Sequence, residues 1–136
     1  MTRINLTNGN VQIPSNGSWQ TILSHWHTPS DASSFLHVDL VAVWKISAQS
    51  GSSDGEWLLT LEIDDVTIGS SVFVCEGNRE SGSCSPIYGL YTNSSTSAKQ
   101  IVLYGKQLFS ADQSLIFNNP STSYMTNWID VTEVKR

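Results

Sequence analysis

Two histidines in the segment His25-Trp26-His27 are the residues of this chain best spaced for metal chemistry. In a β-strand, residues i and i+2 project from the same face, so both rings could reach one ion. A protein metal site needs further ligands, but residues 28–31 contain no glutamate and His37 belongs to the next predicted strand. We therefore expect no metal and no cofactor, and we expect the histidines to be polar residues at the surface or in an interface.

The adjacent carboxylates Asp64 and Asp65 are a second candidate for chemistry. Such a pair can bind calcium or act as an acid–base couple, but two aspartates between strands are also typical of a tight turn. The sequence has neither a glycine-rich phosphate loop nor a Gly-x-Ser-x-Gly nucleophile motif. We expect a hairpin turn at Asp64-Asp65, no catalytic residues, and a protein that is not an enzyme.

The two cysteines, Cys75 and Cys84, enclose residues 76–83. In a reducing cytosol two free thiols are favoured, whereas an oxidising environment permits a disulfide that closes this loop. Zinc is disfavoured because no second Cys or His pair lies nearby to complete a tetrahedral site. Free thiols and a disulfide both remain open from the sequence.

Aromatic side chains offer a different kind of chemistry, because exposed rings stack on sugars or fill subunit interfaces. Trp44 and Trp57 fall on the apolar faces of their predicted strands, so we expect both in the core. The other three tryptophans, Trp19, Trp26 and Trp128, lie nearer strand ends. They are candidates for a glycan site or a subunit interface, and the sequence favours the interface.

Apolar residues along the chain alternate with the period of strands, and no segment keeps a helical period. Polar turns separate the apolar segments at fairly even spacing. The predicted strands are residues 11–13, 19–27, 35–47, 56–63, 66–74, 86–92, 99–109, 114–117 and 124–134. The pattern predicts an all-β, antiparallel β-sandwich or jelly roll of about eight strands. Residues 1–18 form a polar N-terminal arm or edge strand, and residues 19–136 form a single jelly-roll domain.

Charge and the length of the apolar segments exclude two classes of partner, nucleic acids and membranes. The net charge is −5, with twelve acidic and seven basic residues and no basic cluster, so nucleic-acid binding is not expected. No apolar stretch approaches the length of a membrane span, and residues 1–7 lack the apolar core of a signal peptide. Only 14% of the residues are charged, which leaves much uncharged surface for contact with another protein. We expect a product made in, and not secreted from, a host cytoplasm.

The order of several segments resembles one known family. The segments are Gly17-Ser18-Trp19-Gln20-Thr21-Ile22, Thr28-Pro29, Phe35-Leu36-His37-Val38-Asp39-Leu40, residues 59–69 (Leu-Thr-Leu-Glu-Ile-Asp-Asp-Val-Thr-Ile-Gly) and residues 128–134 (Trp-Ile-Asp-Val-Thr-Glu-Val). This order is similar to the trimeric jelly-roll modules, related in shape to tumour-necrosis-factor and C1q heads, of tailed-bacteriophage structural proteins. The chain departs from them in its Cys75–Cys84 loop and in lacking a glycine-rich motif before the last strand.

The resemblance implies a homotrimer that serves as a virion structural protein. Because a short polar arm precedes the domain, we expect a capsid decoration, or cement, protein that binds and stabilises the major capsid protein shell. The arm residues expected to bind this partner are Ile4, Leu6, Val11 and Ile13. The alternative is a receptor-binding or lectin-like tail-fibre module that recognises host surface glycans. Either function places the protein in the virion.

Overall fold

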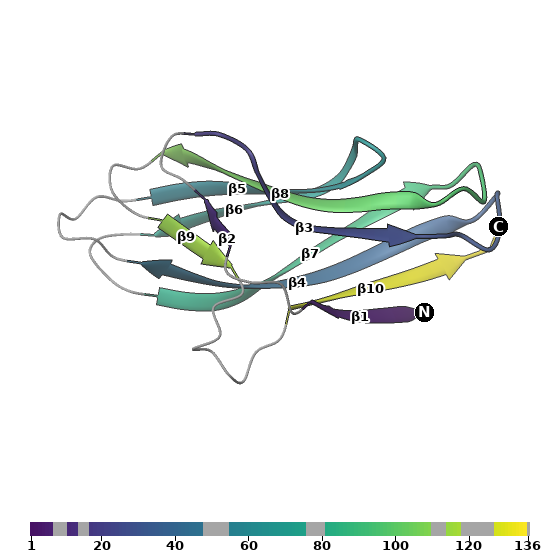
Figure 1. The fold of residues 1–136 in the computed structure, drawn as a ribbon, viewed down its shortest axis with the longest axis horizontal. Helices are drawn as coiled ribbons and strands as arrows, with labels where there is room; N and C mark the ends of the chain where they lie inside the picture. The colour runs from purple at the N-terminus through teal and green to yellow at the C-terminus, as the bar shows by residue number, and fades with distance from the viewer. Residues whose placement is uncertain are drawn as a thin grey trace.

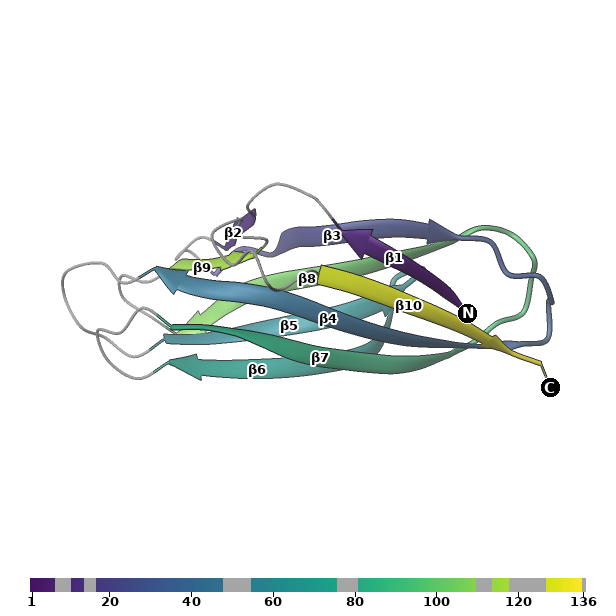
Figure 2. The ribbon, with the colours of Figure 1, turned by 90° about the horizontal axis from the view of Figure 1, so that it is seen from below.

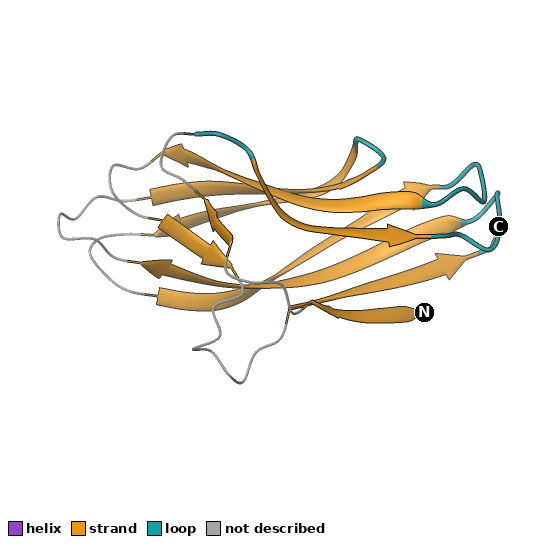
Figure 3. Ribbon diagram, viewed as in Figure 1, coloured by secondary structure: helices purple, strands orange, loops and turns teal. Residues whose placement is uncertain are grey.

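The computed structural model describes residues 1–6, 11–13, 17–47, 55–75, 81–109, 114–117 and 127–135. Within these ranges every regular element is a strand and there is no helix, so no helix could span a membrane (Figure 3). The strands of this part of the chain are β1 (Thr2–Leu6), β2 (Val11–Ile13), β3 (Gln20–His27), β4 (Phe35–Ser47), β5 (Gly55–Ile63), β6 (Val66–Cys75), β7 (Ser81–Thr92), β8 (Lys99–Phe109), β9 (Ser114–Phe117) and β10 (Asn127–Val134).

The strands form two antiparallel sheets that face each other (Figure 1). The main strands of the first sheet follow the order β1-β10-β4-β7, and the second sheet follows the order β3-β8-β5-β6. Each sheet interleaves strands from the two halves of the chain, which is the strand order of a jelly roll with its two Greek keys. The predicted all-β sandwich or jelly roll is therefore confirmed.

Two short strands extend the first sheet beyond this eight-strand framework. Strand β9 pairs with the far half of β4, from Trp44 to Ser47, and β2 pairs with β9. Strand β10 pairs with the near half of β4, from Phe35 to Val41. On the edge of β4 that does not pair with β7, the neighbouring strand is thus β10 at one end of the sandwich and β9 at the other end.

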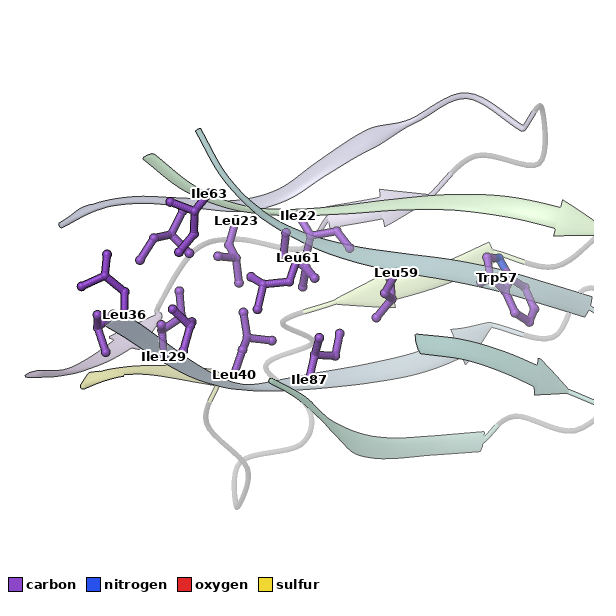
Figure 4. Close-up of a cluster of buried hydrophobic side chains, with 14 of the residues drawn as sticks. Ile22, Leu23, Leu36, Leu40, Trp57, Leu59, Leu61, Ile63, Ile87 and Ile129 are labelled. Atoms are coloured by element: carbon purple, nitrogen blue, oxygen red, sulfur yellow. The ribbon is translucent and has the colours of Figure 1, made fainter. Parts of the chain in front are cut away.

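The core lies between the sheets and is built by strict alternation along the strands (Figure 4). On β5, Trp57, Leu59, Leu61 and Ile63 are all at 0% exposure, as the period-two pattern predicts. On β4, the residues Leu36, Val38 and Leu40 point inward in the same way. Trp57 is therefore a core residue, as expected, whereas the side chain of Trp44 lies outside the part of the chain that the structure describes.

One side of the sandwich is closed by close contact between β6 and β7. A Cβ added to Gly89 would lie 2.6 Å from the carbonyl oxygen of Ile68, and one added to Gly69 would lie 2.5 Å from that of Tyr88. Only glycine permits backbones to approach so closely. On the opposite side, β1 and β3 are the outer strands of their sheets (Figure 2).

The N-terminal strand is part of the first sheet. Residues Thr2 to Leu6 pair with Val131 to Asn127 of β10. The guanidinium of Arg3 also donates two hydrogen bonds to Asp130, from Nε at 2.8 Å and from Nη2 at 2.5 Å. Hydrogen bonding with Arg3 holds the pKa of Asp130 below its ordinary value. Residues 2–6 thus have the geometry of an edge strand, the second of the two alternatives that the sequence left for this segment.

The predicted turn at Asp64-Asp65 joins β5 to β6. Both aspartates have positive φ, at 47° and 63°, as the two central residues of a type I′ hairpin require. Asp64 also accepts hydrogen bonds from Lys99 Nζ and from the backbone amide of Gln100, both at 2.9 Å. Burial raises the pKa of Asp64, but these hydrogen bonds outweigh it and the net shift is downward. The pair therefore has a structural role at one end of β8.

Candidate functional site

The exposed face of the second sheet carries a cluster of aromatic side chains. Trp19 directly precedes β3, and Tyr104 lies on β8 opposite Thr21. Because β3 and β8 are neighbours, the two rings meet edge to face, with centroids 6.4 Å apart and an interplanar angle of 73°. Trp19 remains 47% exposed. The pair therefore combines a fixed geometry with apolar surface open to solvent.

A carboxylate and an ammonium group flank this aromatic pair. Glu62, on β5, lines a cavity of about 250 Å³ together with Trp19 and Tyr104. The hydroxyl of Thr67 donates a 3.3 Å hydrogen bond to Glu62 and so restrains its side chain. Lys106, two residues after Tyr104, holds its Nζ 4.6 Å from the centre of a Trp19 ring. We call Trp19, Tyr104, Glu62 and Lys106 the aromatic site.

The aromatic site is suited to binding by contact. Its ring faces can stack on an apolar ligand surface, the Glu62 carboxylate can accept hydrogen bonds, and the Lys106 ammonium can donate them. Val102, the register partner of Glu62, is only 5% exposed although it lies on the outer face, so neighbouring side chains cover this part of the sheet. This arrangement is of the kind that suits a small polar ligand with an apolar face.

The structure separates the three tryptophans that the sequence singled out. Trp19 and Trp26 lie on the exposed face of the second sheet, where Trp26 is 61% exposed. Trp128 belongs to β10 of the first sheet, where the guanidinium carbon of Arg3 lies 4.6 Å from a Trp128 ring. Trp19 and Trp26 can therefore belong to one binding surface, and Trp128 cannot share it.

The histidine pair faces the interior at the edge of the sandwich. His25 and His27 are both partly buried, and within the described residues His27 Nε2 is buried without a hydrogen-bond partner. Burial lowers the pKa of both rings, while Glu133 acts in the opposite direction on His27. No group of three or more His, Cys, Asp or Glu side chains in the described ranges could hold a metal ion.

The predicted arm residues take their places in the two edge strands of the first sheet. Ile13 is at 0% exposure in the domain's own core because β2 pairs with β9. The side chains of Ile4 and Leu6 lie outside the described part, and Val11 is partly buried against the core. Partner binding by these residues remains a prediction. The side chains of Cys75 and Cys84 also lie outside the described part, so free thiols and a disulfide both remain open.

A polar network joins the β3–β4 connection to β10 at one end of the sandwich. The Glu133 carboxylate accepts hydrogen bonds from the amide and hydroxyl of Ser30, the amide of Asp31 and the hydroxyl of Ser34, at 2.7 to 2.9 Å. These bonds lower the pKa of Glu133 to about 2. Asn93 Nδ2 donates to the carbonyl of Asp31 at 2.7 Å. The network therefore fixes the β3–β4 connection against β10.

The comparisons with known proteins give fold-level similarities alone. No family model matches the chain, and no curated protein matches its sequence. Among solved structures it is similar to the C-terminal domain of EclA, a sugar-binding protein, with 11% identity, a TM-score of 0.49, and coverage of 95% of this chain and 81% of that one. It is also similar to a structure of infectious bursal disease virus, Gt strain, with 16% identity, a TM-score of 0.41, and coverage of 98% of this chain and 37% of that one. The functional proposal therefore depends on the chain's own residues.

Three residues of the aromatic site were absent from the sequence candidates: Tyr104, Glu62 and Lys106. The sequence placed Tyr104 in the predicted strand 99–109 and Glu62 in the predicted strand 56–63, and it related neither residue to Trp19. Their position beside Trp19 depends on β8 lying between β3 and β5 in the sheet, although β8 comes after both strands in the sequence. One signal in the sequence could have pointed to the outer face of this strand. It is the set Gln100, Val102, Tyr104 and Lys106, which alternates with the core residues of the same strand.

Proposed function

We propose that the protein is a non-enzymatic glycan-binding module that uses the aromatic site. The observation that supports this proposal is the juxtaposition of the half-exposed Trp19 ring, the edge-on Tyr104 ring and the Glu62 carboxylate around one cavity. Sugar rings have an apolar face of C–H groups and a rim of hydroxyls. The apolar face can stack on the aromatic rings, and the hydroxyls can form hydrogen bonds with the Glu62 carboxylate and the Lys106 ammonium group.

Binding of free sugars tests this function directly. A glycan array identifies a ligand, and calorimetry with that ligand in solution then compares the native protein with Trp19→Ala and Trp19→Phe. Loss of a stacked ring costs about 1–2 kcal/mol, so Trp19→Ala should weaken binding roughly tenfold. Trp19→Phe should retain most of the affinity.

A matched control comes from the opposite face of the molecule. Tyr88 on β7 is 67% exposed and belongs to the first sheet, so Tyr88→Ala should bind the sugar as the native protein does. A circular dichroism spectrum and melting temperature equal to those of the native protein show that Trp19→Ala is folded. An array without ligands, or equal affinity of native protein and Trp19→Ala, would exclude the glycan site.

A second candidate function is the one implied by the family resemblance, a homotrimeric capsid decoration protein. The observation that favours it is exposed apolar surface on the first sheet, where Leu90 is 58% and Val134 is 49% exposed. Such side chains suit contact with another protein surface. The exposed apolar surface of the first sheet and the aromatic site of the second sheet lie on opposite faces of the sandwich, so one chain can have both functions.

Oligomeric state and capsid binding test the second candidate. Light scattering coupled to gel filtration should give a trimer, and the protein should cosediment with empty capsid shells. If Leu90 lies in either interface, Leu90→Asp should abolish the trimer or the cosedimentation, while Trp19→Ala should change neither. A monomeric protein that stays in the supernatant would exclude capsid decoration by this surface.

A further inference from the structure

A second exposed aromatic ring shares the sheet face with the aromatic site. Trp26, on β3, is 61% exposed and lies directly opposite Gln100 of β8. Side chains alternate between the two faces of a strand, so Ser24 and Trp26 lie on the exposed face while Leu23 points into the core. On β8, Gln100 and Tyr104 share this face for the same reason. Trp26 and Trp19 are thus two aromatic groups on one surface.

The distance between the two aromatic groups exceeds one sugar ring. Tyr104 contacts Trp19, and Gln100 lies beside Trp26, four positions earlier on β8. At about 3.4 Å per residue, four positions along a strand span about 14 Å. A single pyranose cannot touch both groups, whereas a short chain of sugars lying along β3 and β8 can.

On β3 and β8, the polar side chains between the aromatic groups, Ser24 and Gln100, are uncharged. Gln100 Nε2 donates a 3.0 Å hydrogen bond to the hydroxyl of Ser24, which holds the two side chains together across the strands. Amides and hydroxyls keep further donor and acceptor capacity, so they can also bind sugar hydroxyls. Among the described side chains beside this path, Lys106 lies at the Trp19 end, and Glu62, of opposite charge, lines the Trp19 cavity from its position opposite Val102.

Charge also decides which glycans fit. The chain carries a net charge of −5, which disfavours the approach of polyanions. An unbranched chain is the simplest ligand that can follow the path of two neighbouring strands. The expected ligand is therefore linear and uncharged.

We propose that the protein binds an unbranched, uncharged oligosaccharide that extends from Trp19 to Trp26 along β3 and β8. This inference rests on the proposed glycan-binding function and adds a second subsite to it. Trp19 anchors one sugar, Gln100 and Ser24 contact the middle of the chain, and Trp26 stacks on a sugar further along.

Chain-length dependence tests the second subsite. The probes are neutral oligomers of glucose, xylose and N-acetylglucosamine with one to about six units, together with oligomers of a uronic acid of similar length. Affinity of the native protein for the neutral series that binds should rise about tenfold or more between the shortest and the longest chains, as a second stacked ring predicts. Uronic acid chains should bind more weakly than the neutral chains.

Variants separate the two subsites. Trp26→Ala should bind the shortest chains as the native protein does and should lose the gain with length, while Trp26→Phe should keep most of that gain. Trp19→Ala should weaken binding at every length. If Trp26→Ala equals the native protein at every length, or if uronic acid chains bind best, the extended site is wrong although Trp19-dependent binding still stands. If Trp19→Ala has no effect on any chain, the glycan-binding function itself is wrong.

Discussion

Ser30 and Glu133, which are 103 positions apart, meet through two hydrogen bonds to the same carboxylate oxygen. The amide of Ser30 lies 2.9 Å from Glu133 Oε2 and its hydroxyl lies 2.7 Å from it. This contact ties the connection after β3 to the last strand of the chain. The same carboxylate also binds Asp31 and Ser34, so one charged group fixes the start of β4 as well.

Replacing Glu133 with glutamine should destabilise the fold. The glutamine side chain would keep the shape but lose the charge and one acceptor, so the amides of Ser30 and Asp31 would be less well satisfied. The free energy of unfolding should fall by about 1–2 kcal/mol, measured by urea denaturation at neutral pH. Glu62→Gln is a control, since Glu62 accepts a single long hydrogen bond and should change stability much less. Equal losses in both variants would contradict the role of the Glu133 network.

The stability of the fold should decrease on the acid side in two separate steps. Burial lowers the pKa of His25 and His27 in the folded state, so the unfolded chain binds protons more readily there. Their contribution is complete above the ordinary histidine pKa of 6.5 and decreases as the pH falls below it. Glu133 contributes fully above pH 4.5, and its contribution decreases as the pH falls towards about 2.

Urea denaturation at a series of pH values, for the native protein and two variants, separates these steps. His27→Gln should reduce the loss of stability as the pH falls below 6.5 and should leave the lower step in place. Glu133→Gln should reduce the lower step, and the part that remains comes from other carboxylates with lowered pKa values, such as Asp64 and Asp130. A native protein whose stability is constant from about pH 7 to about pH 5 would contradict the buried state of the histidines.

Adding one methyl group at Gly89 should separate the two sheets along β6 and β7. The new Cβ of Gly89→Ala would collide with the backbone of Ile68, which a side-chain rotation cannot relieve. We expect a loss of about 1–3 kcal/mol in unfolding free energy, as overpacking causes in protein interiors. Ser70→Ala, at an exposed position on β6, should be close to neutral. Thermal or urea denaturation that gave Gly89→Ala native stability would show that the backbones can move apart freely.

The turn between β5 and β6 offers a stabilising change. Asp65 has a φ of 63°, a conformation that glycine adopts without steric cost. Asp65→Gly should raise the free energy of unfolding by about 0.5 kcal/mol, because Asp-Gly is a preferred type I′ pair. Asp65→Val should lower it by about 1–2 kcal/mol, because a β-branched residue does not tolerate positive φ. Asp64 should be left unchanged, since it binds Lys99. Melting temperatures that move in the opposite order would contradict this assignment of the turn.

The sequence predicted the strands well because alternation is a local property. The predicted spans 35–47, 99–109 and 114–117 agree with β4, β8 and β9 to the residue. Asp64-Asp65 was predicted as a turn for the same reason, since the preference of two residues for positive φ is local. Strand β1 was harder, because its apolar pattern is short, with Ile4 and Leu6 alone among residues 2–6, and because it pairs with β10 at the other end of the chain.

The aromatic site could be predicted only in part. Trp19 was a candidate because its position near the start of a strand suggested exposure. Tyr104 and Glu62 were not candidates, since nothing local indicates that β8 lies between β3 and β5. The burial of Val102 on an outer sheet face likewise depends on side chains from neighbouring strands. Sites on a sheet face are made by strand order, which hydrophobic periodicity does not specify.

The close contact of β6 and β7 at Gly69 and Gly89 closes one side of the sandwich, whereas the other side, with β1 and β3, stays open. On the closed side, the backbones of β6 and β7 approach each other at Gly69 and Gly89, so each strand covers part of the other and leaves little room for a foreign strand there. On the other side, β1 and β3 are outermost, and Arg3 places a charge on it. Association through backbone hydrogen bonds, whether in an assembly or in a misfolded aggregate, would therefore be directed to the side of β1 and β3, and the Arg3 charge would oppose it at β1.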